Sequence, residues 1–169
     1  TVPVPGLPVP GSNFRTKASG VGDFQIGGLF KLYNRNRHSL HLNLGLSLPT
    51  GSIDETDAAP NPAAGTFSET ILPYPMQLGS GTFDLRPGFT YLGQTDDWSW
   101  GAQVMATARL GENDRDYSLG NQVESSTWIS RRVNEWLSGS FRMRSLVWGN
   151  INGRDAALPT VGPLGFPVE

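Results

Sequence analysis

Two histidines, His38 and His41, are the first candidates for chemistry, because imidazole is a common metal ligand and only two residues separate them. On a β-strand, this spacing places the two side chains on opposite faces of the sheet. We therefore predict no shared metal ion and expect His41 to be an ordinary polar side chain. Neither histidine belongs to a recognisable Ser/His/Asp order, so the sequence predicts no catalytic residue, no enzyme and no cofactor.

An acidic run and a Gly/Ser segment are the next candidates. Asp54, Glu55 and Asp57 carry the oxygen ligands that Ca²⁺ prefers, but their spacing matches no closed ligand loop such as an EF-hand. We expect a solvated acidic loop there. The segment Pro-Thr-Gly-Ser at 49–52 lacks the lysine and the following helix of a phosphate-binding loop. The sequence thus predicts neither a metal site nor a phosphate site.

The composition favours strands and turns over helices. Among 169 residues, 37% are hydrophobic and only 17% are charged, below the roughly 25% usual in soluble domains, and there are 21 glycines and 13 prolines. The absence of cysteine excludes disulfides and thiolate chemistry. A net charge of −2 offers no basic surplus, so we expect no nucleic-acid partner. No apolar run approaches the roughly 18 residues of a membrane-spanning helix.

Long strands of alternating polarity are the elements that would position any site. The clearest is 40–48, where five leucines alternate with polar or small residues, a period that cannot form a helical stripe. Pro87 predicts a bulge or a pairing gap in its own strand, because proline has no N–H to donate. Strand 121–132 has the weakest pattern, with Trp128 opposite Val123 and Ile129. The same alternation predicts strands at 22–33, 82–92, 98–110 and 137–147.

Turns and loops alternate in length along the chain. Short polar turns follow the first, third and fifth strands, beginning with Asn34–Arg37, whereas long loops are expected at 49–80, 111–120 and 149–169. Residues 1–20 begin with a Pro/Gly/Val stretch that we expect to be extended. A meander with short turns at one end and long loops at the other is typical of outer-membrane barrels.

Strand length and aromatic placement favour the same class. The predicted strands exceed the 5 to 6 residues or so of globular strands and suit the roughly 9 to 11 of a tilted membrane strand. Tyr91, Trp98 and Trp100 share the apolar face beside one tight turn, where a lipid-facing aromatic girdle would lie. We therefore predict an all-β, antiparallel up-and-down transmembrane β-barrel over 21–148, in the bacterial outer membrane. The alternative is a soluble β-sandwich.

Six strands cannot close a membrane barrel, since about eight is the minimum observed. We therefore expect an incomplete part of a larger barrel; the alternative is that further copies or a partner chain complete it.

The polar faces of these strands would line a lumen. Basic residues outnumber acidic ones there, which favours anions or aromatic acids, as charged rings do in pores. The alternative is a plugged or structural lumen in which arginines pair with aspartates. Segment 71–76 could fold inward as a constriction or shield the rim. The predicted lumen-lining residues are Lys31, Asp23, His41, Asn43, Asp84, Arg86, Gln103, Arg109, Arg142 and Arg144.

Several segments resemble one known family. They are FRT with SGVGD at 14–23, LHLNLGLSLPTGSIDE at 40–55, LPYPMQLGSGTFDLRPGFTYLGQ at 72–94, WSWGAQ at 98–103 and WGNINGRD at 148–155. These segments, LPTGS and QLGSGTFD above all, resemble a family of bacterial outer-membrane transporters named for a MetA pathway of phenol degradation. The resemblance implies an outer-membrane barrel with a transport role and supplies no catalytic residues.

The predicted function is a channel or transporter that passes small, hydrophobic, aromatic or anionic compounds by passive or facilitated diffusion. Its partners would be the lipid bilayer and a small-molecule solute. The alternative is a structural outer-membrane barrel that anchors a partner complex or assembles with one, as a homo-oligomer or with another chain.

Overall fold

The fold is that of a computed structural model that describes residues 15–61 and 66–158. Within these residues the chain forms strands, one short 3₁₀ turn and no α-helix, which confirms the all-β prediction. The extended stretch expected at 1–11 lies outside them. The six long strands agree with the predicted ranges to within two residues at each end: β1 (Phe24–Arg35), β2 (His38–Leu48), β5 (Phe83–Gln94), β6 (Trp98–Leu110), β8 (Gln122–Arg132) and β9 (Ser138–Trp148).

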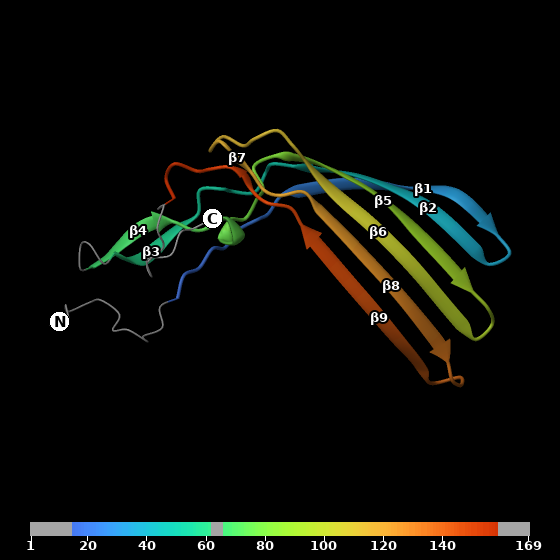
Figure 1. The fold of residues 1–169 in the computed structure, drawn as a ribbon. Helices are drawn as coiled ribbons and strands as arrows, with labels where there is room; N and C mark the ends of the chain where they lie inside the picture. Colours follow the sequence, from blue (N-terminus) through green and yellow to red (C-terminus); the bar gives the residue numbers. More distant parts are fainter. Residues whose placement is uncertain (1–14, 62–65, 159–169) are drawn as a thin grey trace.

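These six strands form one antiparallel sheet in the order β1-β2-β5-β6-β8-β9, so each pairs with the next long strand along the chain. The strand directions rotate progressively from β1 to β9, the twist usual in open sheets (Figure 1). Within the described ranges β1 and β9 do not pair with each other. The sheet is therefore open, and no closed barrel is present in the part described.

A bulge in β1 corrects one predicted side-chain direction. Lys31 pairs with His41, but the next pair is Tyr33 with Leu40, so Leu32 is an extra residue on β1. A bulge shifts the alternation of its strand by one residue. Tyr33 therefore belongs to the apolar side with Leu40, whereas simple alternation from Phe24 places it on the polar side.

The pairing gap predicted at Pro87 is confirmed. β5 pairs with β6 from Phe83 to Leu85 and again from Gly88 onward, whereas Arg86 and Pro87 have no partner on β6. The register is the same on both sides of the gap, so the interruption is a missing rung and not a bulge. On its other side Pro87 still pairs with Leu44 of β2.

The short turns lie at one end of the sheet and the long connections at the other (Figure 1). The first turn is tighter than expected, because Asn34 and Arg35 still belong to β1 and only Asn36 and Arg37 make the turn. These two residues have φ values of 51° and 63°. Two successive positive φ values are typical of a two-residue type I′ hairpin.

The long loops contain structure that the sequence does not predict. Segment 49–80 includes a separate two-stranded hairpin of β3 (Thr56–Asn61) and β4 (Thr66–Ile71), followed by the 3₁₀ turn η1 (Tyr74–Met76). A second small ladder joins β7 (Tyr117–Ser118) to β10 (Asn152–Gly153). The segments expected as loops at 49–80, 111–120 and 149–169 thus contain these short elements in their described parts. All these elements lie at the end of the sheet opposite the tight turns (Figure 1).

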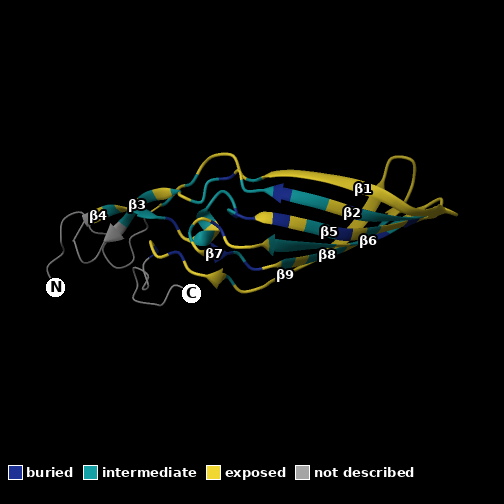
Figure 2. Ribbon diagram, turned by 90° about the horizontal axis from the view of Figure 1, so that it is seen from above, coloured by how far each residue is buried: buried dark blue, intermediate teal, exposed yellow. Residues whose placement is uncertain are grey.

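Burial is concentrated in the loop end and on the polar side of the central strands. Leu72, Tyr117 and Leu158 are the buried hydrophobic residues of the described chain, and all three belong to the long connections. In contrast, β1 and β9 are exposed along their whole length, whereas β2 is half-buried over most of its length and β5 combines buried, half-buried and exposed residues (Figure 2). None of the helical turns in the described residues is long and apolar enough to cross a bilayer.

Candidate functional site

The polar face gathers the predicted site residues into rows, because an antiparallel register aligns paired residues across the sheet. Eight of the ten predicted residues occupy four neighbouring rows of the sheet. Of the other two, Arg142 pairs with Trp128, nearer the tight turns, and Asp23 directly precedes β1. Their role in lining a lumen remains a prediction. The four rows, from the turn side to the loop side, are Lys31-His41-Thr90-Gln103-Ser126-Arg144, Leu29-Asn43-Gly88-Met105-Glu124-Leu146, Gly27-Gly45-Arg86 with Thr107-Gln122-Trp148 beyond the gap, and Gln25-Ser47-Asp84-Arg109.

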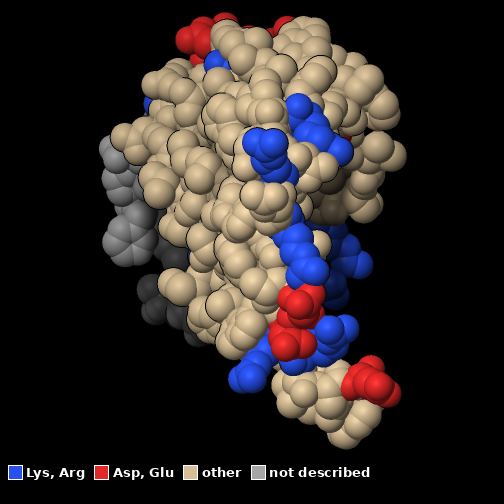
Figure 3. All heavy atoms as spheres, turned by 90° about the vertical axis from the view of Figure 1, so that its right-hand side faces the viewer, with Lys and Arg blue, Asp and Glu red and all other residues tan. Residues whose placement is uncertain are grey.

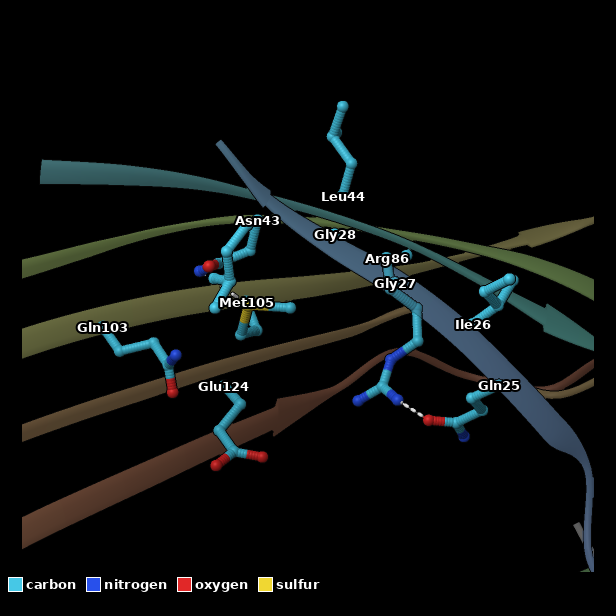
Figure 4. Close-up of a pocket in the computed structure, with 12 residues that line it drawn as sticks. Gln25, Ile26, Gly27, Gly28, Asn43, Leu44, Arg86, Gln103, Met105 and Glu124 are labelled. Carbon is cyan, nitrogen blue, oxygen red and sulfur yellow. Dashed lines mark hydrogen bonds between the residues drawn. The ribbon is translucent and has the colours of Figure 1, made fainter. Parts of the chain in front are cut away.

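A cavity of about 510 Å³ lies against the middle rows. Figure 4 shows Asn43, Arg86, Met105 and Glu124 extending to one side of the sheet, with Leu44 on the other. Its remaining lining residues include Gln25, Gly27, Leu29, Gly45 and Gln103. The cavity therefore combines one guanidinium, one carboxylate, three amide side chains and a soft apolar wall.

The charges at this cavity are not paired with each other. Glu124 is held by Arg144, with the Nε–Oε1 and Nη2–Oε2 distances both 2.7 Å. Arg86 instead donates a hydrogen bond to the amide oxygen of Gln25, and it takes part in none of the ion pairs of the described chain. Arg86 is thus a cation whose protein partner is neutral.

Asn43 brings a buried amide to the same cavity. Its side chain is 6% exposed, and its Nδ2 donates to Thr90 Oγ1 at 2.8 Å, as does Nε2 of Gln103. Its Oδ1 is buried and has no hydrogen-bond partner among the described residues. A buried polar atom without a partner is destabilising, so such an atom at a cavity wall calls for an explanation.

A buried ionic network closes the loop end of the polar face. Arg109 and Asp84 form an ion pair with side chains 11% and 3% exposed. Asp84 also accepts from Thr82 Oγ1 at 2.7 Å and from Ser80 Oγ at 3.2 Å. Asp23 accepts from the backbone and the hydroxyl of Ser80 at 2.8 and 2.9 Å. Two predicted lumen residues, Asp84 and Arg109, are therefore partners of each other.

A second cavity of about 340 Å³ lies under η1, between this network and the first cavity. Tyr74 and Pro75 line it together with Arg86 and Trp148. The ring of Tyr74 packs on Tyr117 with a centroid distance of 4.4 Å. Tyr74 and Pro75 of segment 71–76 therefore lie over the polar face, and the choice between a constriction and a shield of the rim stays a prediction.

Aromatic side chains cluster on the apolar face at the tight-turn end. Tyr91 and Trp100 both lie 5.9 Å from the ring of His38, whose Nδ1 is 2.7 Å from the Tyr91 hydroxyl. Beside them the Arg131 guanidinium lies 5.1 Å from the ring of Trp98. The predicted girdle residues therefore lie near one another. Sequence reasoning did not include His38 in this group, although its spacing of two residues from Leu40 places it on the same face.

Charged side chains follow the same end of the sheet. Figure 3 views the molecule from this end and shows Lys and Arg side chains following one another, with acidic side chains between some of them. Arg37 pairs with Asp96 at 2.5 Å and Arg132 with Asp97 at 3.5 Å, and all four side chains are more than half exposed.

Asp54 and Asp57, which the sequence offers as candidate metal ligands, contact other groups of the protein. Within the described residues no group of His, Asp or Glu is arranged to hold a metal ion. Asp54 pairs with Arg115 at 2.5 Å, and this contact raises the pKa of the Arg115 guanidinium. Asp57 accepts the backbone N–H groups of Lys17 and Ala58, each at 2.7 Å, which lower the pKa of its carboxyl. At the neighbouring loop, burial raises the pKa of the Tyr117 phenol.

Comparison with known proteins identifies one family. The family model described as "Putative MetA-pathway of phenol degradation" matches residues 4–141, which is most of the chain. The chain therefore belongs to this family, in agreement with the resemblance of its segments. No curated protein matches the chain.

Proposed function

We propose that this member of the phenol-degradation MetA-pathway family is part of a bacterial outer-membrane β-barrel, and that its polar face lines a passage for small aromatic or anionic solutes. One observation carries the proposal: a single long meander has an exposed apolar face and a polar face that holds two cavities. Paired strands of 11 to 13 residues reach across a bilayer core, for which about 9 to 11 tilted residues suffice.

The apolar face supports the membrane part of the proposal. Phe89, Val104 and Phe141 are 52%, 48% and 63% exposed, although burying such side chains is worth about 1.5 to 3 kcal/mol each. A face of this kind requires a covering, and lipid chains supply one along the full length of the strands. The cluster of Tyr91, Trp98 and Trp100 at one end then lies where interfacial aromatic residues are enriched.

Charge supports the choice of solute. On the polar face Arg109 and Arg144 are each paired with an acid. Among the described residues Arg86, Lys31 and Arg142 take part in no ion pair, and of these three only Arg86 lines the cavity, where it can attract an anion. The description of the family refers to phenol degradation, and aromatic acids combine an anion with a flat ring that stacks on guanidinium.

Reconstitution of the native protein in liposomes tests the proposal. We expect swelling in isotonic solutes of small size, and planar-bilayer recordings with a preference for anions over cations. A cation preference that is unchanged by Arg86→Ala would overturn the anion assignment. Liposomes that swell no faster than protein-free ones would overturn the channel.

A structural role is the second candidate, and the unpaired edges favour it. Among residues 15–61 and 66–158 no strand pairs with the outer edge of β1 or of β9, which are 12 and 11 residues long, and such edges invite pairing with further strands. Strands from a partner chain on these edges would make the barrel an anchor for an assembly. Stoichiometric co-purification of another chain, together with a closed pore, would support this candidate over the first.

A further inference from the structure

We propose that the cavity at the centre of the polar face is a binding subsite for a planar aromatic monocarboxylate with a hydrogen-bond donor at its far end, and that Arg86 is its specificity-determining residue. The inference rests on the proposed function, because a solute must reach this face. It goes further by naming the ligand class and the groups that hold it.

Arg86 provides the carboxylate contact. A guanidinium carries five N–H donors in a planar fork that matches a carboxylate with two parallel hydrogen bonds. The contact of Arg86 with Gln25 uses Nη1, so donors remain for a ligand. The missing rung beside Pro87 separates Arg86 from β6, and its side chain lines both cavities of this face.

The charge of the cavity is positive despite its one carboxylate. Glu124 is engaged by Arg144 through two contacts of 2.7 Å, which neutralises it locally. Arg86 is the remaining charged residue of the lining. An anion is therefore attracted, whereas an amine of the same shape gains nothing from Arg86.

Two glycines make the wall beside Arg86 flat. Gly27 and Gly45 pair with each other, and Gly45 pairs with Arg86, so two neighbouring positions on this face lack side chains. A β-carbon at Gly45 would lie 3.4 Å from Cβ of Arg86. The strip is bordered by Leu29 and Met105. A flat strip with apolar borders suits an aromatic ring better than a puckered one, and about 510 Å³ is ample for one ring.

Asn43 supplies the contact at the other end of the ligand. Its Oδ1 is buried without a partner, and it lies one row from Arg86, since Asn43 pairs with Gly88. Asn43 and Arg86 are diagonal neighbours on adjacent strands, and such positions lie about 7 to 8 Å apart, a distance comparable with the length of a para-substituted ring. On binding, the Asn43 amide would turn toward the cavity, and a hydroxyl or amino group on the ring would then satisfy the acceptor that the protein leaves unpaired.

Calorimetric titration of the native protein in detergent tests the subsite, with 4-hydroxybenzoate, benzoate, cyclohexanecarboxylate and benzylamine as probes. We expect this order of affinity, with benzylamine not bound. Arg86→Gln should weaken 4-hydroxybenzoate about tenfold or more, since it removes a charge-assisted contact. Arg132→Gln is the matched control, because Arg132 is an exposed guanidinium at the tight-turn end, outside the cavity, and it should change affinity less than twofold.

Two further variants protect the test from a folding failure of the Arg86 variant. Asn43→Ala should reduce 4-hydroxybenzoate to the affinity of benzoate while leaving benzoate itself unchanged. Gly45→Val should reject the ring probes, because its side chain fills the flat strip. Equal affinities for 4-hydroxybenzoate and benzylamine, or full affinity in both Arg86→Gln and Gly45→Val, would overturn the subsite.

The subsite and the channel can fail separately. Liposomes that swell while calorimetry detects no binding of the aromatic acids would reject the subsite and leave the channel standing. Binding that Arg86→Gln abolishes, in a protein that passes no solute, would reject the channel and leave the subsite standing.

Discussion

The two ends of the sheet each contain an arginine–aspartate pair, and the two pairs have the same charged groups but differ in how far they are exposed to solvent. At the loop end Arg109 and Asp84 are 11% and 3% exposed, whereas at the turn end Arg37 and Asp96 are 53% and 81% exposed. The buried pair is embedded in hydroxyl contacts from Ser80 and Thr82. The comparison teaches that the contribution of an ion pair depends on what replaces water around it.

Breaking the buried pair should have the largest effect. Arg109→Met leaves the Asp84 carboxylate buried without its cation, and we expect a loss of about 3 to 5 kcal/mol in the free energy of unfolding, measured by urea titration. The double variant Asp84→Leu with Arg109→Met should recover much of this loss, because no isolated charge remains. A loss below about 1 kcal/mol in the single variant would place the pair with the exposed ones.

Close backbone approach at the loop end should give the next effect. A β-carbon at Gly79 would collide with the carbonyl oxygen of Gly51, so Gly79→Ala must displace one of the two segments. We expect a loss of about 1 to 3 kcal/mol by urea titration. Gly139→Ala, near the tight turns, is the control, because nothing lies within 4 Å of its β-carbon. Equal losses in both variants would remove the contrast between the ends.

Alkaline pH should destabilise the loop end through Tyr117, with a smaller effect than the two preceding substitutions. Burial holds the pKa of Tyr117 above its ordinary value of 10.0, so the folded state keeps the proton that the unfolded state releases. The resulting stability is fully present below pH 10 and is lost as the pH rises toward the folded pKa. We expect the urea midpoint of the wild type to fall more steeply above pH 10 than that of Tyr117→Phe, which has no phenol to titrate. Parallel pH profiles would contradict this.

The exposed pair should give the smallest effect. Arg37→Gln removes a contact of 2.5 Å, but both side chains are solvated, and exposed pairs are worth about 0 to 1 kcal/mol. We expect a change in unfolding free energy at the low end of this range, removed entirely by high salt. A loss as large as that of Arg109→Met would show that the turn end also depends on its ion pair.

Sequence reasoning recovers what depends on neighbours along the chain. The six strands, their faces and the gap at Pro87 follow from alternation and from the missing N–H of proline. The bulge at Leu32 does not follow, because only pairing with β2 reveals an extra residue. Likewise the strands β3 and β4 are six residues each, too short to show a clear alternation, and Pro60 in β3 argues against a strand in the sequence.

The candidate site divides in the same way. Alternation places Arg86, Asn43 and Arg109 on one face, but it cannot say that Arg109 is engaged by Asp84 while Arg86 is not. Ser80 and Thr82, which also bind Asp84, lie within four residues of it, but the Asp84–Arg109 contact joins residues that are 25 apart in the sequence. Long-range contacts of this kind leave no local pattern in the sequence.

The missing rung at Pro87 also affects how fast the backbone amides of the sheet exchange their protons with solvent. Strands usually fray from their ends, where hydrogen bonds are fewest, and amide protons there exchange first with solvent. In this sheet the ladder between β5 and β6 is interrupted in the middle, so the neighbouring backbone of Ala106 and Thr107 is paired on the β8 side alone. Amide exchange should therefore be fast at the centre of this strand pair and slow on either side of it. Part of the interior of the sheet would then exchange its amide protons faster than the regions around it.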